Sequence, residues 1–240
     1  MIDLASAQLS PFEGMSAVSK LSLPDQVFNS LRDALMSGRF APGQRVPLRT
    51  IATALGTSTM PVREAVNRLV AMGALEFLPN RRVSVPALSS RRYGDLAAAR
   101  VIIESSAAEA AASLLSDAQI DELTLVHAQM RACLAQLDKP EAAQTFLDLN
   151  KRFHFIVYAV NESETLMSII ESLWLQVGPY LNLVLKDSKD WFTTDQHGPL
   201  LEALQQRDAR KAKITMHDNI EYAAKFMLVN NRLEAVRQID

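Results

Sequence analysis

The scarcity of glycine in the second part of the chain constrains the fold more than any other feature. After Pro86 the remaining 154 residues contain three glycines and run in long amphipathic stretches. Apolar residues that recur every three to four positions form one face of a helix, and glycine is disfavoured inside helices. The pattern predicts helices at residues 90–114, 117–137, 141–160, 163–186, 190–206 and 208–230, which together form an all-α antiparallel helical bundle.

A different order of elements precedes this bundle. Apolar spacing predicts a helix from Leu23 toward Gly38, a short helix over residues 48–55, and a third that begins at Pro61 and ends before Gly73. Two strand-like segments, 74–78 and 83–85, follow and suit a hairpin with a basic tip. This order is that of a winged helix-turn-helix, so the expected fold is mainly α.

The expected domain organisation follows from these elements. Residues 1–20 mix Ser, Ala, Pro and Gly and are expected to form a flexible N-terminal arm. Residues 21–88 are expected to form the winged helix-turn-helix DNA-binding domain. Residues 89–232 are expected to form the all-helical domain.

Charge divides the chain in the same place. Residues 1–92 hold 11 Lys and Arg against 6 Asp and Glu, whereas residues 93–240 hold 14 against 21. A basic head on an acidic body suits a DNA-binding protein, because phosphate contacts need local positive charge. No apolar run approaches the roughly 20 residues of a membrane span, and the N-terminus lacks a signal-peptide pattern, so a cytoplasmic protein is expected.

The third predicted helix carries the argument for DNA binding. When its apolar stripe is buried, Arg63 and Asn67 lie one turn apart on a face that can enter the major groove. Arg is suited to bidentate contact with guanine, and Asn with adenine. Ser58 and Thr59 lie at the helix start, where hydroxyls and backbone N–H groups can hold a phosphate. The alternative for Arg68 is an ion pair with Glu64 at i, i+4.

The stretch LGTSTMPVREAVNRLVAMGALEFLPNRRVSV resembles the signature of the GntR family of bacterial regulators. The resemblance implies that Arg49 and Arg63 contact DNA. The family usually has Arg-Thr where this chain has Thr59 and Met60, and Gly where this chain has Arg82. Thr59 and Met60 are therefore expected to contact a thymine methyl group or a sugar in place of the usual arginine contact. The DNA-binding residues predicted are Arg49, Ser58, Thr59, Met60, Arg63, Asn67, Asn80, Arg81 and Arg82.

The helical domain resembles the FadR-type C-terminal domain of this family, known as FCD. The resemblance is carried by Arg100-Val-Ile-Ile-Glu104, by Asn150-Lys-Arg-Phe-His154, and by the helix that follows His197. Many such domains bind a divalent cation, such as zinc or nickel, through one Asp and three His, and the cation holds an effector carboxylate. Here Asn150 and Asn219 occupy two of the four positions.

Two interpretations of these residues remain open. His154 and His197 either bind a metal ion, with Asn150 and Asn219 as weak ligands, or they hydrogen-bond the effector directly or are buried core residues with their hydrogen bonds satisfied. Arg100 either binds an effector carboxylate or pairs with Glu104. The effector-binding residues predicted are Arg100, Asn150, His154, His197 and Asn219.

The function expected is that of a homodimeric, sequence-specific transcriptional regulator that binds an operator in double-stranded DNA. A small organic or sugar acid is expected to modulate its operator affinity. The alternatives are a small helical metal-dependent enzyme and an architectural DNA-binding protein without a ligand. The enzyme is disfavoured because no HExxH, nucleophile elbow or phosphate-binding loop accompanies the histidines.

Overall fold

The head of the protein is built from three helices and a small sheet. The computed structural model describes residues 21–79, 82–136, 139–186, 195–229 and 233. Helices α1 (Leu23–Met36), α2 (Leu48–Ala54) and α3 (Thr59–Ala71) precede strands β1 (Glu76–Phe77) and β2 (Val83–Ser84), which pair antiparallel. The predicted winged helix-turn-helix is therefore confirmed. The predicted flexible arm, residues 1–20, lies outside the described residues.

Local sequence explains where these head elements begin. The side chain of Ser22 accepts a hydrogen bond from the backbone N–H of Asp25 and so caps α1. Helix α3 begins at Thr59, two residues before the predicted Pro61. Proline is tolerated in the first turn because N–H groups there have no helical partner, so the N–H that proline lacks costs no hydrogen bond. The backbone of Gln44 and Val46 also bonds to that of Val85 and Val83, which extends the wing by one short segment.

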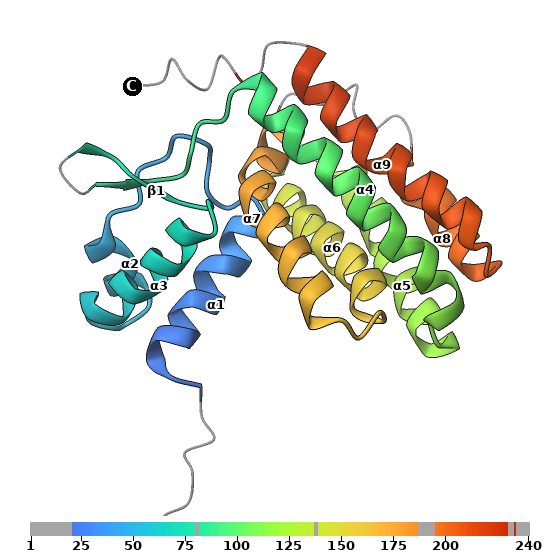
Figure 1. The fold of residues 1–240 in the computed structure, drawn as a ribbon, viewed down its shortest axis with the longest axis horizontal. Helices are drawn as coiled ribbons and strands as arrows, with labels where there is room; N and C mark the ends of the chain where they lie inside the picture. Colours follow the sequence, from blue (N-terminus) through green and yellow to red (C-terminus); the bar gives the residue numbers. More distant parts are fainter. Residues whose placement is uncertain (1–20, 80–81, 137–138, 187–194, 230–232, 234–240) are drawn as a thin grey trace, which may run out of the picture.

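The rest of the described chain is a bundle of long helices. They are α4 (Ser90–Leu114), α5 (Asp117–Leu134), α6 (Pro140–Ala159), α7 (Glu164–Lys186), α8 (Gly198–Gln205) and α9 (Ala209–Val229). Figure 1 shows α4 and α9 side by side along the bundle, with the head at one end next to α7. No helix within the described residues is long and apolar enough to cross a membrane.

Helix α8 begins later in the chain than the sequence pattern predicts. The pattern predicts a helix from residue 190, but α8 begins at Gly198, and residues 187–194 lie outside the description. The carboxylate of Asp195 accepts hydrogen bonds from the backbone N–H groups of His197 and Gly198. Asp195 therefore satisfies N–H groups that have no partner at the start of the helix.

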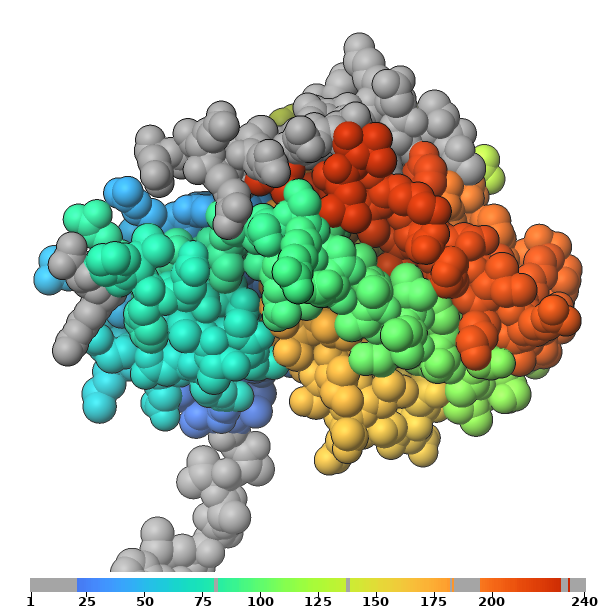
Figure 2. Space-filling model, turned by 45° about the horizontal axis from the view of Figure 1, so that its top comes forward, coloured from blue at the N-terminus to red at the C-terminus, as the bar shows by residue number. Residues whose placement is uncertain are grey.

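Head and bundle share one apolar core. The buried residues of α1 and α3 belong to the same continuous cluster as those of α4, α5, α6 and α7. Figure 2 shows the head as a lobe in blue to blue-green lying against the green and orange helices of the bundle. The position of the head is thus set by apolar contact as well as by the covalent link.

Candidate functional site

The outer face of α3 carries the predicted DNA-reading residues. Pro61, Val62, Ala65, Val66 and Leu69 are buried against the head core, and this fixes which face is turned outward. The structure leaves Thr59, Met60, Arg63 and Asn67 exposed on that outward face, with Ser58 directly before it. Met60 is 80% exposed, which is unusual for so large an apolar side chain.

Arg68 has a structural contact that sequence spacing did not predict. Its Nη1 lies 2.7 Å from Oδ1 of Asp25, and its guanidinium stacks 3.9 Å from the centre of the Phe28 ring. The Ser22 hydroxyl and Arg68 lower the pKa of the Asp25 carboxyl. Arg68 therefore ties α3 to α1, and the alternative of an Arg68–Glu64 pair does not describe its contacts.

The wing and α2 add further basic side chains beside α3. Arg49 is exposed on α2, and Arg82 is exposed at the start of the second wing strand. A cleft between the wing and α2 is lined by Arg45, Leu48 and Arg82. Sequence reasoning missed Arg45, because only the pairing of its backbone with Ser84 places it at the wing. Asn80 and Arg81 lie outside the described residues.

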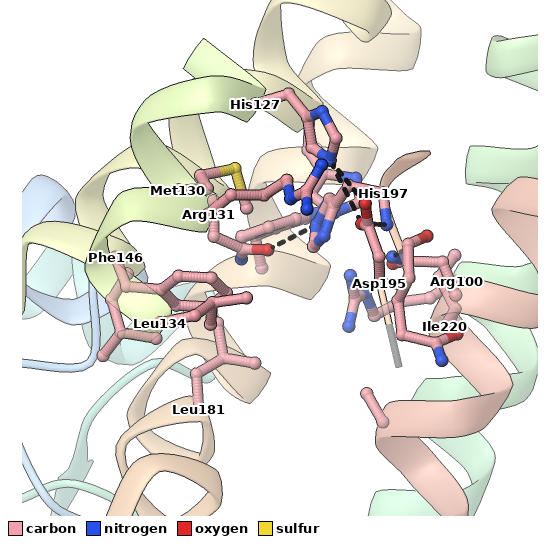
Figure 3. Close-up of a pocket in the computed structure, with 17 residues that line it drawn as sticks. Arg100, His127, Met130, Arg131, Leu134, Phe146, Leu181, Asp195, His197 and Ile220 are labelled. Carbon is pink, nitrogen blue, oxygen red and sulfur yellow. Dashed lines mark hydrogen bonds and ion pairs between the residues drawn. The ribbon is translucent and has the colours of Figure 1, made fainter. Parts of the chain in front are cut away.

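The bundle encloses a cavity of about 80 Å³ around the predicted effector residues. The structure brings together all five of them, from four different helices or their ends: Arg100, Asn150, His154, His197 and Asn219. Figure 3 shows Leu134, Phe146 and Leu181 grouped away from Arg100 and Asp195. The cavity thus has a polar end and an apolar end.

Arg100 at the polar end is bound by a buried carboxylate. Its Nε lies 2.6 Å from Glu104 Oε1, and its Nη2 lies 3.0 Å from Oε2. Oε2 also accepts hydrogen bonds from the Tyr158 hydroxyl at 2.5 Å and from Trp174 Nε1 at 3.1 Å. Burial alone would lower the pKa of Arg100, but the negative charge of Glu104 more than offsets this and raises it.

The two buried histidines are hydrogen-bonding groups. His154 Nδ1 lies 3.0 Å from the Tyr158 oxygen, whose proton is donated to Glu104, so His154 is the donor in its pair. His197 Nε2 lies 2.9 Å from Asn150 Oδ1. Burial lowers the pKa of His154 well below its usual value and that of His197 to about 4, so both imidazoles are neutral at pH 7.

The donor set at this end does not fit a divalent metal ion. Structural and catalytic zinc sites use Cys, His and carboxylate ligands, and among the described residues no group of three or more His, Cys, Asp or Glu could hold an ion. Asn150 and Asn219 supply no negative charge, and their side chains already bond to His197 and to the Gln196 carbonyl. We therefore derive no role for a metal.

Sequence reasoning missed two residues at the cavity mouth. His127 on α5 lines the cavity, and its Nε2 lies 2.9 Å from Oδ2 of Asp195. Asp195 is 68 residues away in the chain, so no spacing rule links it to His127. Burial would raise the pKa of the Asp195 carboxyl, but hydrogen bonds from the Gly198 backbone and from His127 lower it overall.

Helix α6 connects the cavity with the head. Leu147, Asn150 and His154 line the cavity from this helix. Other side chains of α6 contact the end of α1 and the residues after it. Gln144 Nε2 donates to the Ser37 carbonyl at 2.9 Å, Asp148 accepts from Arg39 at 2.8 Å, and Lys151 donates to Asp33 at 3.1 Å.

Helix α7 makes a second connection. Trp174 lines the cavity, and the Tyr180 hydroxyl, less than two turns further along, bonds to the backbone between head and bundle. It accepts from the Leu88 N–H at 2.5 Å and donates to the Pro86 carbonyl at 3.0 Å. The cavity is therefore joined to the head through two helices.

Comparison with known proteins agrees with this arrangement. Residues 23–85 match the family model described as bacterial regulatory proteins, gntR family, and residues 95–222 match the FCD domain. The HTH-type transcriptional regulator McbR of Escherichia coli K12 is 28% identical over 81% of this chain and 88% of its own length. The Exu regulon transcriptional regulator of the same organism is 28% identical over 87% and 85%.

Solved structures share the fold. The structure of E. coli McbR/YncC superposes with a TM-score of 0.75 at 24% identity, covering 91% of this chain and 99% of that one. A putative GntR transcriptional regulator from Rhodococcus sp. RHA1 superposes with a TM-score of 0.59, also at 24% identity, covering 91% and 98%. The overall arrangement of head and bundle is thus shared with these structures.

Proposed function

The chain belongs to the GntR family of bacterial transcriptional regulators and carries that family's FCD domain, and from this premise we propose that a small molecule bound in the cavity controls its affinity for an operator. The relatives are regulators, so the alternative of a metal-dependent enzyme is set aside. We assign residues 21–88 to DNA binding and residues 89–232 to effector binding and dimerisation. Such a regulator acts in the bacterial cytoplasm.

The outward face of α3 is the observation that carries the DNA-binding proposal. Arg63 and Asn67 are exposed, and the described residues offer them no ion pair or side-chain hydrogen bond, whereas Arg68 is held by Asp25. A base edge in the major groove supplies the missing partners. Arg49 and Arg82 flank this face, with Ser58, Thr59 and Met60 at the helix start, and contact the sugar-phosphate backbone or the adjacent groove.

A homodimer follows from the limited reach of one head. One recognition helix contacts too few base pairs to specify an operator, and two heads related by two-fold symmetry read paired half-sites. The bundle supplies the dimer contact in this proposal, because the outward face of α3 must stay free for DNA. Sedimentation of the full chain at micromolar concentration tests this, with a monomeric mass contradicting it.

Helix α6 supports the proposed coupling between effector and operator. A ligand that contacts Asn150 or His154 touches the same helix whose Gln144, Asp148 and Lys151 contact the head. Binding that favours one position of α6 therefore favours one position of the head. The expectation of a carboxylate-bearing effector rests on Arg100, which lines the cavity.

Selection of DNA from a random pool tests the assignment of α3, and it requires no operator sequence at the outset. The wild-type chain is expected to enrich a two-fold symmetric sequence, and Arg63→Ala is expected to lose the enrichment at one base pair per half-site, a loss of about 1–3 kcal/mol in discrimination. Arg68→Ala is the matched control, because it removes an arginine of the same helix whose side chain contacts α1 instead of facing outward. It is expected to lower the melting temperature and enrich the wild-type sequence.

If Arg63→Ala enriches the same sequence as the wild type with equal discrimination, another element reads the operator. If Arg68→Ala loses discrimination while Arg63→Ala retains it, the outward face of α3 is assigned incorrectly.

A further inference from the structure

The positive charge of the cavity is already neutralised by a buried carboxylate. Each of the four groups that contact Glu104, namely Nε and Nη2 of Arg100, the Tyr158 hydroxyl and Trp174 Nε1, is a donor. A carboxyl group that only accepts hydrogen bonds is ionised. Arg100 and Glu104 therefore form a pair of zero net charge, and Glu104 does not itself line the cavity.

No other buried group at the polar end adds a charge. Asn150 and Asn219 are amides, and the buried imidazoles of His154 and His197 are neutral. At the mouth, the exposed Arg131 and the anionic Asp195 have opposite charges, and Asp195 is paired with His127. Of the two arginines that line the cavity, Arg131 is exposed and Arg100, the buried one, is compensated by Glu104, so an anion buried at the polar end would find no uncompensated buried cation. A buried charge without a partner is strongly disfavoured.

We propose that the cavity binds an uncharged amphipathic molecule, with a carbonyl-containing head such as an amide or lactone at Arg100 and Asn150 and a short apolar chain or ring toward Phe146. This inference rests on the proposed function, because it specifies the effector of that same site. It replaces the expectation of a carboxylate, which requires the positive charge of Arg100 to be free for the ligand.

The hydrogen-bonding groups left in the cavity match such a head. Among the described residues, Arg100 Nη1 and Asn150 Nδ2 are donors without a protein partner, and a carbonyl oxygen accepts from both kinds of group. His154 donates through Nδ1, so its Nε2 is an acceptor for an amide N–H or a hydroxyl. One acceptor and one donor on adjacent atoms of the ligand satisfy these groups.

The apolar end and the volume limit the rest of the molecule. Leu134, Phe146 and Leu181 offer only hydrocarbon surface to a ligand. A sugar acid carries a hydroxyl on nearly every carbon, and at this end those hydroxyls would lose water without gaining a hydrogen-bond partner. The cavity of about 80 Å³ has room for roughly five to eight water molecules. A short alkyl chain or a single aromatic ring fills that space.

Matched pairs of amide and acid test the proposal, because each pair differs mainly in charge. The full chain, in buffer with a chelator at pH 7.5, is melted with hexanamide or hexanoate and with benzamide or benzoate. At least one amide is expected to raise the melting temperature by about 2 °C or more above its acid, as a ligand several-fold above its Kd would. Leu134→Trp, which fills the apolar end, is expected to abolish the shift, whereas Leu125→Trp, on the exposed face of the same helix, retains it.

Three results overturn the proposal. Acids that stabilise the chain as well as their amides would show that the polar end accepts an anion, and this would leave effector control of the operator intact. An amide shift that persists in Leu134→Trp would place the binding elsewhere. No shift with any compound would exclude a small neutral head as the ligand, whereas the DNA selection above independently tests the regulator itself.

Discussion

At Gly178 on α7 the bundle packs closely against the end of α1 in the head, and a single added methyl group tests that contact. A Cβ atom at this position would lie 2.5 Å from the Leu35 carbonyl oxygen and 2.7 Å from the Met36 Cα. Both are backbone atoms at the end of α1, so no side-chain rotation relieves the clash. Gly178→Ala therefore requires α1, and the head with it, to move away from α7.

The size of the effect follows from two opposing contributions. Overpacking a rigid contact costs about 1–3 kcal/mol, whereas Ala in place of Gly inside a helix contributes about 0.5–1 kcal/mol. The net expectation is a loss of about 1–2 kcal/mol in the free energy of unfolding, or a melting temperature lower by roughly 2–8 °C. Urea titration followed by circular dichroism measures it, together with a thermal melt.

Gly94→Ala on α4 is the matched control for this measurement. A Cβ at Gly94 would meet no atom within 4 Å, so this variant receives only the helix contribution and is expected to be more stable than wild type by about 0.5–1 kcal/mol. If Gly178→Ala were stabilised like Gly94→Ala, the end of α1 would not touch α7 in solution. The close attachment of head to bundle would then be incorrect.

Two further predictions concern the polar end of the cavity. Glu104→Gln leaves the buried Arg100 without its counter-ion and is expected to cost about 3–5 kcal/mol in urea unfolding. Glu109→Gln, which removes an exposed pair with Lys213, costs less than about 1 kcal/mol, and equal losses would contradict the burial of the Arg100–Glu104 pair. His197 has its folded pKa lowered to about 4 from 6.5, so the unfolded chain binds more protons between those values and stability falls as pH falls through that window. Between pH 6.5 and pH 4 the free energy of unfolding of the wild type is expected to fall by about 3 kcal/mol, and that of His197→Asn by clearly less. Parallel pH profiles of the two proteins would refute the assignment of this loss to His197.

The helices and the wing could be predicted because their signals are local. Apolar spacing, proline in first turns and glycine at helix ends predicted each helix of the described structure, most to within a few residues. The contacts of Arg68 could not be predicted in the same way. Spacing offered Glu64 as its partner, whereas its actual partner, Asp25, lies 43 residues earlier on another helix.

In the candidate site, too, local motifs could be predicted and contacts between distant segments could not. Resemblance to the FCD domain named the five effector residues, and the structure gathers them around one cavity. His127 and Asp195 were missed because their pairing depends on where α8 begins relative to α5, and helix periodicity carries no information about that. Arg45 was missed because the third segment of the wing is too short to have a strand pattern of its own.

Arg100 shows why residue identity alone did not decide the class of ligand. The i, i+4 spacing of Arg100 and Glu104 indicated a pair, and an inward-facing arginine indicated an anion site, and the two were treated as alternatives. A guanidinium has two edges, so pairing with Glu104 and lining the cavity are compatible: Nε and Nη2 bind Glu104, and Arg100 is also part of the cavity wall. The charge that a ligand meets is therefore set by Glu104, which does not line the cavity. Tyr158 and Trp174 both donate hydrogen bonds to that carboxylate and so hold it in place beside Arg100.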